Sequence, residues 1–428
     1  MNKLKIVFRY SSNKNGITLV SLVITIIILI ILSTVTITAV LGDNGLIDQA
    51  QQTKNLADSS IEHEDENMNH LSQEYANLRM EDIEIEKITI VDYKKSGEVF
   101  NKKTTVEDEV GNKITVPEGF KIAPDSGDTV EQGVVIEDVN ASTDKNVQGS
   151  QYVWIPTGKF KKDNGELSNE IILGRYTFDE NNGTPHMVQN AEDYTNQSDN
   201  ILIESIYKEL IEYREGIASE RLDGLNATAK GLGTFIGSVK LNGGYYIGRY
   251  EASYASGSTS TSTVSDYSVC KAASKISTSF SNSMIYNPGT LWNNISQLNA
   301  SKVAINTYAN SGSVISDLPS SYAWDTAIVY IQEAGNTNYA NQDGQSINST
   351  LTNTGTKQDE VCKINDLSSN IEEWSTEYST TNNGTSAFPC TLRGGYYGSG
   401  SRSPSYRGAG NSYSGYFEGG GFRICLYL

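Results

Sequence analysis

The chain has 428 residues, of which 37% are hydrophobic and 20% are charged, which supplies material for at least one large folded domain and excludes a disordered protein. Lys and Arg total 33 against 51 Asp and Glu, so the formal net charge is -18. A surface this acidic repels phosphate groups, and nucleic acid is therefore excluded as a partner.

A long apolar run dominates the N-terminus. Ile17 to Leu41 is a run of 25 uncharged, mostly aliphatic residues. At about 1.5 Å of rise per residue, a helix of this length crosses the hydrocarbon layer of a membrane. A cleavable secretory signal has a shorter apolar region, of roughly 7–15 residues. The sixteen residues before the run include four basic residues and no acidic one, which favours a cytoplasmic location for them. We therefore expect a transmembrane helix, with the rest of the chain outside the cytoplasm.

The junction before this run, NKNGITLVSL, resembles the signal of type IV prepilins and pseudopilins. The resemblance implies cleavage between Gly16 and Ile17, a leader at residues 1–16 and a pilin helix at residues 17–41, on a bacterial cell surface. Most such pilins carry glutamate at the fifth mature position, where this chain has Ser21. The protein is therefore expected to be a tether or a minor subunit, membrane-anchored or associated with a pilus and its other pilins. A plain single-span membrane anchor is the alternative interpretation.

Beyond the apolar run, the chain divides into a stalk and a globular domain. Residues 42–86 are polar, with apolar side chains three and four residues apart, which predicts a helical stalk. From residue 87 the pattern changes to short alternating segments punctuated by Gly and Pro, such as NKITVPEGFKIA, which predicts strands. An acidic stretch near residues 179–220, containing the helical pattern ILIESIYKELIEYREGIASE, is expected to be a surface insertion. The expected fold class is α+β, with one domain over residues 87–428.

Three of the four tryptophans lie in short motif segments of this domain. Large aromatics in such segments usually anchor a core, so Trp154, Trp324 and Trp374 are predicted to be core residues. Arg393 precedes Gly394, and Arg423 lies two residues after Gly421. We expect both guanidinium groups to be structural clamps on carboxylates or carbonyls rather than ligand contacts.

Six segments identify a family by their content and order. They read YVWIPTG from Tyr152, GGYYIGRYE from Gly243, LPSSYAWDTA from Leu318, NDLSSNIEEW from Asn365, LRGGYYGSG from Leu392 and GFRICLYL from Gly421. Together they resemble the formylglycine-generating enzyme, or sulfatase-modifying factor, family, whose domain is a variant of the C-type lectin fold. The resemblance spans roughly residues 110–428.

The oxidase of this family uses two copper-binding cysteines after the RGG motif. Counted from Arg393, the matching positions are Ser399 and Pro404, neither of which binds copper, so the resemblance implies neither copper nor the oxidation. The sequence has no phosphate-binding loop, HExxH or GxSxG pattern, and the domain has a single histidine, His186. We therefore expect no enzyme; altered chemistry in the same fold is the least supported alternative.

The four cysteines are expected to form disulfides outside the cytoplasm. Cys270, Cys362, Cys390 and Cys425 allow three pairings. The resemblance implies that the RGG and GFR strands lie close together, which favours Cys390 paired with Cys425.

The resemblance also implies a calcium site at the segment NDLSSNIEEW. The matching ligands are the side chains of Asp366 and Glu373 and the backbone carbonyls of Ser369 and Ile371. Oxygen ligands of this kind suit a hard cation such as calcium. An acidic turn without a metal is the alternative.

The C-terminal stretch from Tyr396 to Glu418 is composed mainly of Tyr, Ser, Gly, Asn and Ala, which make up 18 of its 23 residues. Adaptable binding surfaces favour these residues, because Tyr gives large contacts at low entropic cost and Ser, Gly and Asn give adjustable hydrogen bonds. The predicted ligand contacts are Tyr396, Tyr397, Ser399, Ser401, Tyr406, Asn411, Tyr413 and Tyr416. A Gly/Ser-rich loop that merely covers the core is the alternative.

These features predict a surface-displayed, pilin-anchored adhesin or receptor with an extracellular protein or glycan ligand. A minor pilin or pseudopilin with a structural domain is the alternative. A lectin-like fold with variable Tyr, Ser, Asn and Gly positions near its C-terminus also resembles the target proteins of diversity-generating retroelements.

Overall fold

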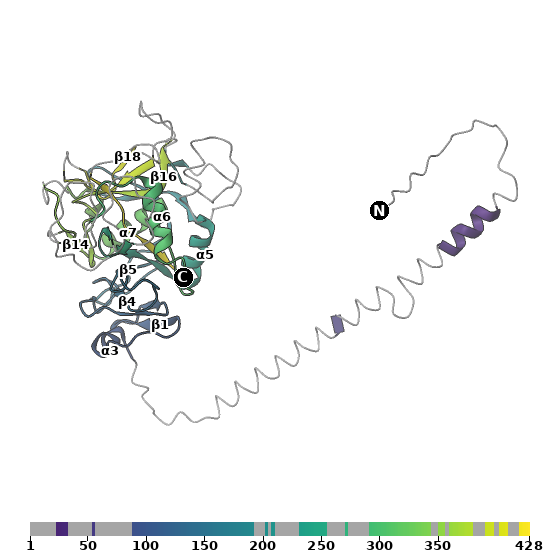
Figure 1. Ribbon diagram of the computed structural model, residues 1–428, viewed down its shortest axis with the longest axis horizontal. Helices are drawn as coiled ribbons and strands as arrows, with labels where there is room; N and C mark the ends of the chain where they lie inside the picture. The colour runs from purple at the N-terminus through teal and green to yellow at the C-terminus, as the bar shows by residue number, and fades with distance from the viewer. Residues whose placement is uncertain are drawn as a thin grey trace, which may run out of the picture. The chain divides into compact units, whose positions relative to one another are not determined.

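The computed structural model describes residues 23–32, 54–55, 88–191, 202–203, 207–209, 231–254, 270–272, 291–343, 350–355, 359–379, 390–397, 402–409 and 419–428. The chain divides into two compact units, Met1–Glu86 and Lys87–Leu428, which are drawn in Figure 1. Each unit is described by itself below.

The first unit contains a short described helix. Residues 23–32 are helical and their large apolar side chains are exposed, that of Leu29 by 60%. Among the described residues, no helix has both the length and the apolarity needed to cross a membrane. The cleavage site at Gly16 and Ile17, much of the predicted membrane helix and nearly all of the stalk at residues 42–86 lie outside the described residues. These assignments therefore stay predictions.

A six-stranded sheet brings together distant parts of the second unit. Its order is β13-β20-β10-β5-β4-β3, and each neighbouring pair is antiparallel. Every residue of β5 and β10 is buried, as apolar runs rich in β-branched and aromatic residues predict. The strands are β3 (Phe120–Ile122), β4 (Val135–Asp138), β5 (Gln151–Pro156), β10 (Gly244–Gly248), β13 (Ile315–Asp317) and β20 (Cys425–Tyr427). Three of the six family-like segments thus become neighbouring strands.

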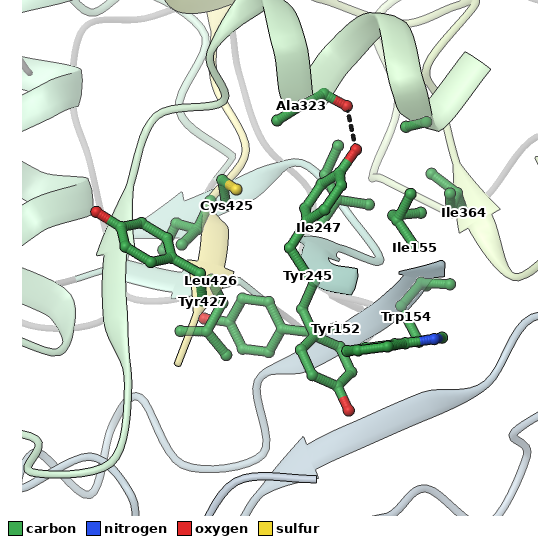
Figure 2. Packing of buried hydrophobic residues seen from close by; sticks show 14 of the residues in the cluster. Tyr152, Trp154, Ile155, Tyr245, Ile247, Ala323, Ile364, Cys425, Leu426 and Tyr427 are labelled. Carbon is green, nitrogen blue, oxygen red and sulfur yellow. Dashed lines mark hydrogen bonds between the residues drawn. The ribbon is translucent and has the colours of Figure 1, made fainter. Parts of the chain in front are cut away.

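The helices that contact this sheet include α5 (Leu232–Asn242) and α7 (Ser321–Glu333). Trp154 of β5 packs edge-on against Tyr246 of β10, with ring centres 5.0 Å apart. Figure 2 shows Tyr245 reaching from β10 to α7, where its hydroxyl donates a hydrogen bond to the carbonyl of Ala323. Trp154, Trp324 and Trp374 are each at most 1% exposed, so their predicted core role is confirmed.

A second sheet is built mainly from the C-terminal part of the chain. Its order is β18-β17-β16-β9-β8, and β19 pairs in parallel with β16. The labels of β16 and β18 stand at the opposite end of the second unit from those of β1, β4 and α3 (Figure 1). The strands are β8 (Leu202–Ile203), β9 (Tyr207–Glu209), β16 (Glu372–Ser379), β17 (Cys390–Arg393), β18 (Arg407–Ala409) and β19 (Gly420–Gly421).

The helix predicted within the insertion is wrong where the structure describes it. Residues 202–203 and 207–209 form strands β8 and β9, and β9 pairs antiparallel with β16. Pairing at a sheet edge supplies backbone hydrogen bonds, and this tertiary context outweighs the local helical pattern. The start of the insertion belongs to a hairpin of β6 (Gly174–Phe178) and β7 (Pro185–Asn190).

The remaining elements are short. They are α3 (Ile90–Ser96), β1 (Thr104–Glu107), β2 (Lys113–Val116), β11 (Ala252–Tyr254), β12 (Cys270–Ala272), α6 (Gln297–Thr307), η2 (Tyr339–Asn341), β14 (Glu360–Val361) and β15 (Ile364–Asn365). Strands outnumber helices among the described residues, and the two kinds are mixed. The second unit is therefore an α+β domain dominated by sheets, as the sequence predicts.

Candidate functional site

Two tyrosines of the predicted binding stretch flank one arginine, and a third tyrosine packs against the first of them. Tyr396 and Tyr397 follow β17, and their ring centres are 4.7 Å apart. The guanidinium carbon of Arg402 lies 5.7 Å from the ring centre of Tyr396 and 4.7 Å from that of Tyr406, within the range of cation–π attraction. All four residues are half-buried. We call Tyr396, Tyr397, Arg402 and Tyr406 the tyrosine patch.

Glycine backbone supports two of these rings. A side chain at Gly419 would place its Cβ 2.0 Å from Cε2 of Tyr396, and one at Gly408 would place its Cβ 2.8 Å from Cε1 of Tyr406. Real Cβ contacts are essentially never this short, so each ring lies directly against the backbone of its glycine. Gly419 also has φ of +87°, which favours glycine. The glycines in this stretch therefore seat the aromatic rings.

The segment that carries Arg402 and Tyr406 is anchored to the core by side chains. The indole Nε1 of Trp324 donates to the carbonyl of Pro404 at 2.8 Å. Nε of Arg393 donates to the carbonyl of Tyr406 at 3.1 Å. Trp324 and Arg393, two buried residues of the family-like segments, thus hold the backbone of the patch in place.

A buried carboxylate adjoins the tyrosine patch. Glu372, the first residue of β16, is 1% exposed, and its Oε1 forms an ion pair with Arg402. Its Oε2 is buried and has no hydrogen-bond partner among the described residues. Burial raises the pKa of Glu372 to about 7, although the charge of Arg402 acts in the opposite direction.

Five charged groups form an arginine cluster in the interior: Arg175, Arg393, Arg407, Asp325 and Glu377. Arg393 donates to Asp325 at 2.6 Å, Arg175 to Glu377 at 2.9 Å and Arg407 to Glu377 at 3.1 Å. No side chain of the cluster is more than 9% exposed. Burial raises the pKa of Glu377, but the three guanidinium groups lower it further, so it lies below its ordinary value. The clamp role predicted for Arg393 is confirmed.

Acidic groups predominate around the other predicted clamp, Arg423. Its Nε donates to both oxygens of Glu373, at 2.9 and 2.7 Å, and its Nη1 donates to the carbonyl of Gly248 at 3.0 Å. The clamp role predicted for Arg423 is therefore confirmed. Burial raises the pKa of Glu251, and that of Asp366 to about 7. We call Glu251, Asp366, Glu373 and Arg423 the acid-rich group. The ring centre of Trp324 lies 5.9 Å from the guanidinium carbon of Arg423 and 5.6 Å from that of Arg393, so Trp324 contacts both this group and the arginine cluster.

The residues predicted to bind calcium already have other partners. Asp366 accepts hydrogen bonds from a threonine hydroxyl at 2.8 Å and a glycine N–H at 2.6 Å. The oxygens of Glu373 are held by Arg423. Binding calcium through this side chain would require Glu373 to leave its guanidinium, and the calcium site stays a prediction. Elsewhere in the described ranges, too, no group of three or more His, Cys, Asp or Glu is placed to hold a metal ion.

The predicted disulfide is wrong. Cys390 and Cys425 are both free thiols. Cys390 begins β17, which pairs with β16 and β18, whereas Cys425 begins β20, which pairs with β10 and β13. The strands that carry the two cysteines, β17 and β20, therefore belong to different sheets.

Part of the predicted ligand-binding set can be placed. Tyr396, Tyr397 and Tyr406 lie together in the tyrosine patch. Five further predicted contacts lie outside the described residues: Ser399, Ser401, Asn411, Tyr413 and Tyr416.

Arg402 and Glu372 were not predicted as site residues. The position of Arg402 inside the tyrosine-rich stretch is the signal that points to it. Glu372 stands where the family-like motif has tryptophan, and that departure marks the carboxylate.

A cavity of about 510 Å³ lies elsewhere in the second unit. Its lining includes Ile171 and Leu173 from the segment before β6, and Ile236 and Lys240 from α5. None of the predicted site residues lines it, so its size does not make it the candidate site.

Comparisons with known proteins add little. No family model matches the chain, and no curated protein sequence matches it significantly. One solved structure, the major tropism determinant P3c variant, is similar at 14% sequence identity and a TM-score of 0.27. The similarity covers 77% of this chain and 82% of that chain. A similarity of this size decides neither the fold family nor the function.

Proposed function

We propose that this chain is a surface-displayed, pilin-anchored ligand-binding protein of the adhesin or receptor type. Its tyrosine patch, with the rest of the stretch from Tyr396 to Tyr416, would contact an extracellular protein or glycan. The observation that carries the proposal is that Tyr396 and Tyr406 flank Arg402 while Tyr397 packs against Tyr396, and that all four residues are half-buried. A loop that only covered the core would not need to bring three aromatic side chains together there.

The chemistry of the patch suits recognition. A tyrosine ring offers a large apolar face and a hydroxyl, with few rotatable bonds to immobilise on binding. The rings of Tyr396 and Tyr406 are already seated on glycine backbone. A pre-organised aromatic surface loses less conformational entropy when a ligand arrives.

We further propose that the scaffold is a lectin-like domain of the formylglycine-generating enzyme type. The six family-like segments support this assignment, and three of them are neighbouring strands β5, β10 and β20. The two copper-cysteine positions are Ser399 and Pro404. The proposal is therefore binding rather than catalysis.

The test uses the full-length protein displayed on cells and arrays of immobilised glycans and peptides as probes. The triple variant Tyr396→Ala, Tyr397→Ala, Tyr406→Ala is expected to weaken binding to the recognised array component by about tenfold or more, as loss of central aromatic contacts does. The control variant Leu167→Ala, Leu241→Ala removes two exposed apolar side chains outside the patch. It should bind as the unchanged protein does. Equal binding by the triple variant and the control would show that the patch is not the binding surface.

Two further observations test the setting of the domain. Sparse or tip location in filament preparations supports a binding role, whereas regular incorporation supports the alternative of a structural minor pilin. Absence of a template repeat and a reverse transcriptase near the 3′ end of the gene would remove the retroelement hypothesis and leave the binding proposal unchanged.

A further inference from the structure

We propose that Glu372, Tyr396 and Tyr406 form a guanidinium-binding site, half filled by the chain's own Arg402, and that the ligand is a protein that inserts an arginine side chain there. The inference rests on the proposed function, because it places the ligand at the tyrosine patch. It adds the chemical class of the group that is recognised.

The first support is the state of the Glu372 carboxylate. Oε1 is paired with Arg402, while Oε2 is buried and has no hydrogen-bond partner among the described residues. A buried carboxylate oxygen without a donor is destabilising, and a donor that reaches it gains a charge-assisted bond. The site therefore has an acceptor in place that this part of the chain leaves unused.

The second support comes from another glutamate of the same strand. Glu377 also lies in β16, and its carboxylate accepts hydrogen bonds from Arg175, Arg393 and Arg407. One carboxylate in this fold thus accommodates several guanidinium groups. Glu372 pairs with only one such group, Arg402, within the described residues.

The third support is the pair of aromatic walls. Tyr396 and Tyr406 stand 5.7 and 4.7 Å from the guanidinium carbon of Arg402, and both rings are backed by glycine. A planar guanidinium stacks on aromatic faces while it donates to a carboxylate, whereas the ammonium of lysine is compact and strongly hydrated. Rings and carboxylate together therefore select arginine over lysine.

The site can be reached from solvent along Arg402. The Arg402 side chain is 25% exposed although its partner Glu372 is 1% exposed, so the guanidinium enters from the surface. Because Oε2 itself is buried, an incoming arginine that follows the same route reaches it when the Arg402 side chain moves aside. The chain carries a net charge of -18, which attracts a basic partner over a longer range.

The experiment measures the affinity of the full-length protein for hexa-arginine and hexa-lysine peptides by isothermal titration calorimetry at 150 mM salt. Both peptides feel the net charge of the protein, so the ratio of their dissociation constants isolates the guanidinium site. The unchanged protein should prefer hexa-arginine by about tenfold. Glu372→Gln should bring the ratio close to one, while the control Glu98→Gln, which removes one exposed charge elsewhere, should keep it.

Two other variants keep the test valid if Glu372→Gln does not fold. Tyr396→Leu and Tyr406→Leu leave the carboxylate in place and remove one aromatic wall each, so each should lower the ratio by a few-fold. Arg402→Ala removes the side chain that now occupies the site. This variant should therefore bind hexa-arginine more tightly than the unchanged protein does. An unchanged ratio in Glu372→Gln, or in both tyrosine variants, would overturn the guanidinium site.

Failure of this inference is distinguishable from failure of the proposed function. Suppose that the triple tyrosine variant no longer binds the array ligand, but Glu372→Gln keeps the preference for hexa-arginine. The patch is then the binding surface, and it recognises a group other than guanidinium. If the triple variant keeps the array ligand, the patch is not the binding surface at all.

Discussion

The interior arginine cluster and the surface site at Glu372 use the same chemistry at two positions of strand β16. Glu377 is fully buried and accepts from three guanidinium groups, whereas Glu372 pairs with one that enters from solvent. Burial alone raises the pKa of both carboxyls; that of Glu377 ends below its ordinary value and that of Glu372 at about 7. Glu377, with three arginine partners, stabilises the fold. Glu372, with one arginine partner among the described residues, is the carboxylate that we propose for ligand binding.

The largest expected effect is that of Glu377→Gln on stability. The substitution leaves three buried guanidinium groups facing one remaining carboxylate, that of Asp325. Breaking a buried ion pair from one side costs about 3–5 kcal/mol in free energy of unfolding. Glu372→Gln should cost about 1 kcal/mol or less, because its partner is partly exposed. Denaturant unfolding of both variants checks the difference, and equal losses would show that the two sites do not differ as described.

The next expected effect concerns the glycine under Tyr396. Gly419→Ala should destabilise by about 1–2 kcal/mol through its positive φ, and it should also displace the Tyr396 ring. Gly165→Ala is the matched control, because Gly165 has the same φ of +87° and only a lysine Cε at 4.0 Å. Gly419→Ala should lose more stability than Gly165→Ala in thermal melts, because only its Cβ collides with a ring, and only Gly419→Ala should lose the preference for hexa-arginine. Loss of that preference in both would mean that backbone strain, and not the ring, controls binding.

The pH dependence of stability should reflect the lowered pKa of Glu377. A carboxyl whose folded pKa lies below its unfolded value contributes full stability above the unfolded pKa and loses it as pH falls through the folded pKa. The loss amounts to about 1.4 kcal/mol per unit of pKa lowering. Free energies of unfolding measured from pH 7 to pH 2 should fall less steeply on the acid side in Glu377→Gln than in the unchanged protein. If the free energy of unfolding falls equally steeply with pH in both proteins, carboxyls other than Glu377 cause the loss of stability in acid.

Much of the core was predictable from the sequence. Large aromatic side chains in short motif segments, such as Trp154 and Trp374, stabilise a fold when they are buried, and both are. Arg393 and Arg423, each within two residues of a glycine, were predictable as clamps, since a nearby glycine lets a guanidinium approach backbone and carboxylates closely. Local residue chemistry fixes such positions without knowledge of the topology.

Features that depend on strand pairing were not predictable. β8 and β9 lie in a segment with a helical pattern and become strands because β9 pairs with β16. Cys390 precedes the RGG motif and Cys425 follows the GFR motif, yet their strands, β17 and β20, belong to different sheets. Glu372 and Arg402 are thirty positions apart in the sequence, and neither residue by itself indicates that the other is its partner.

The smallest expected effect is that of calcium, and it bears on the acid-rich group around Arg423. Glu373 already has a guanidinium on both oxygens, and Asp366 accepts two hydrogen bonds. Millimolar calcium after treatment with a chelator should therefore leave the thermal midpoint unchanged, because a cation would have to displace Arg423. A rise in the midpoint that disappears in Asp366→Asn would instead favour the calcium site implied by the family-like motif. In that case Arg423 must turn away from Glu373 when the ion binds, and the acid-rich group, like Glu372, would hold capacity for a cation.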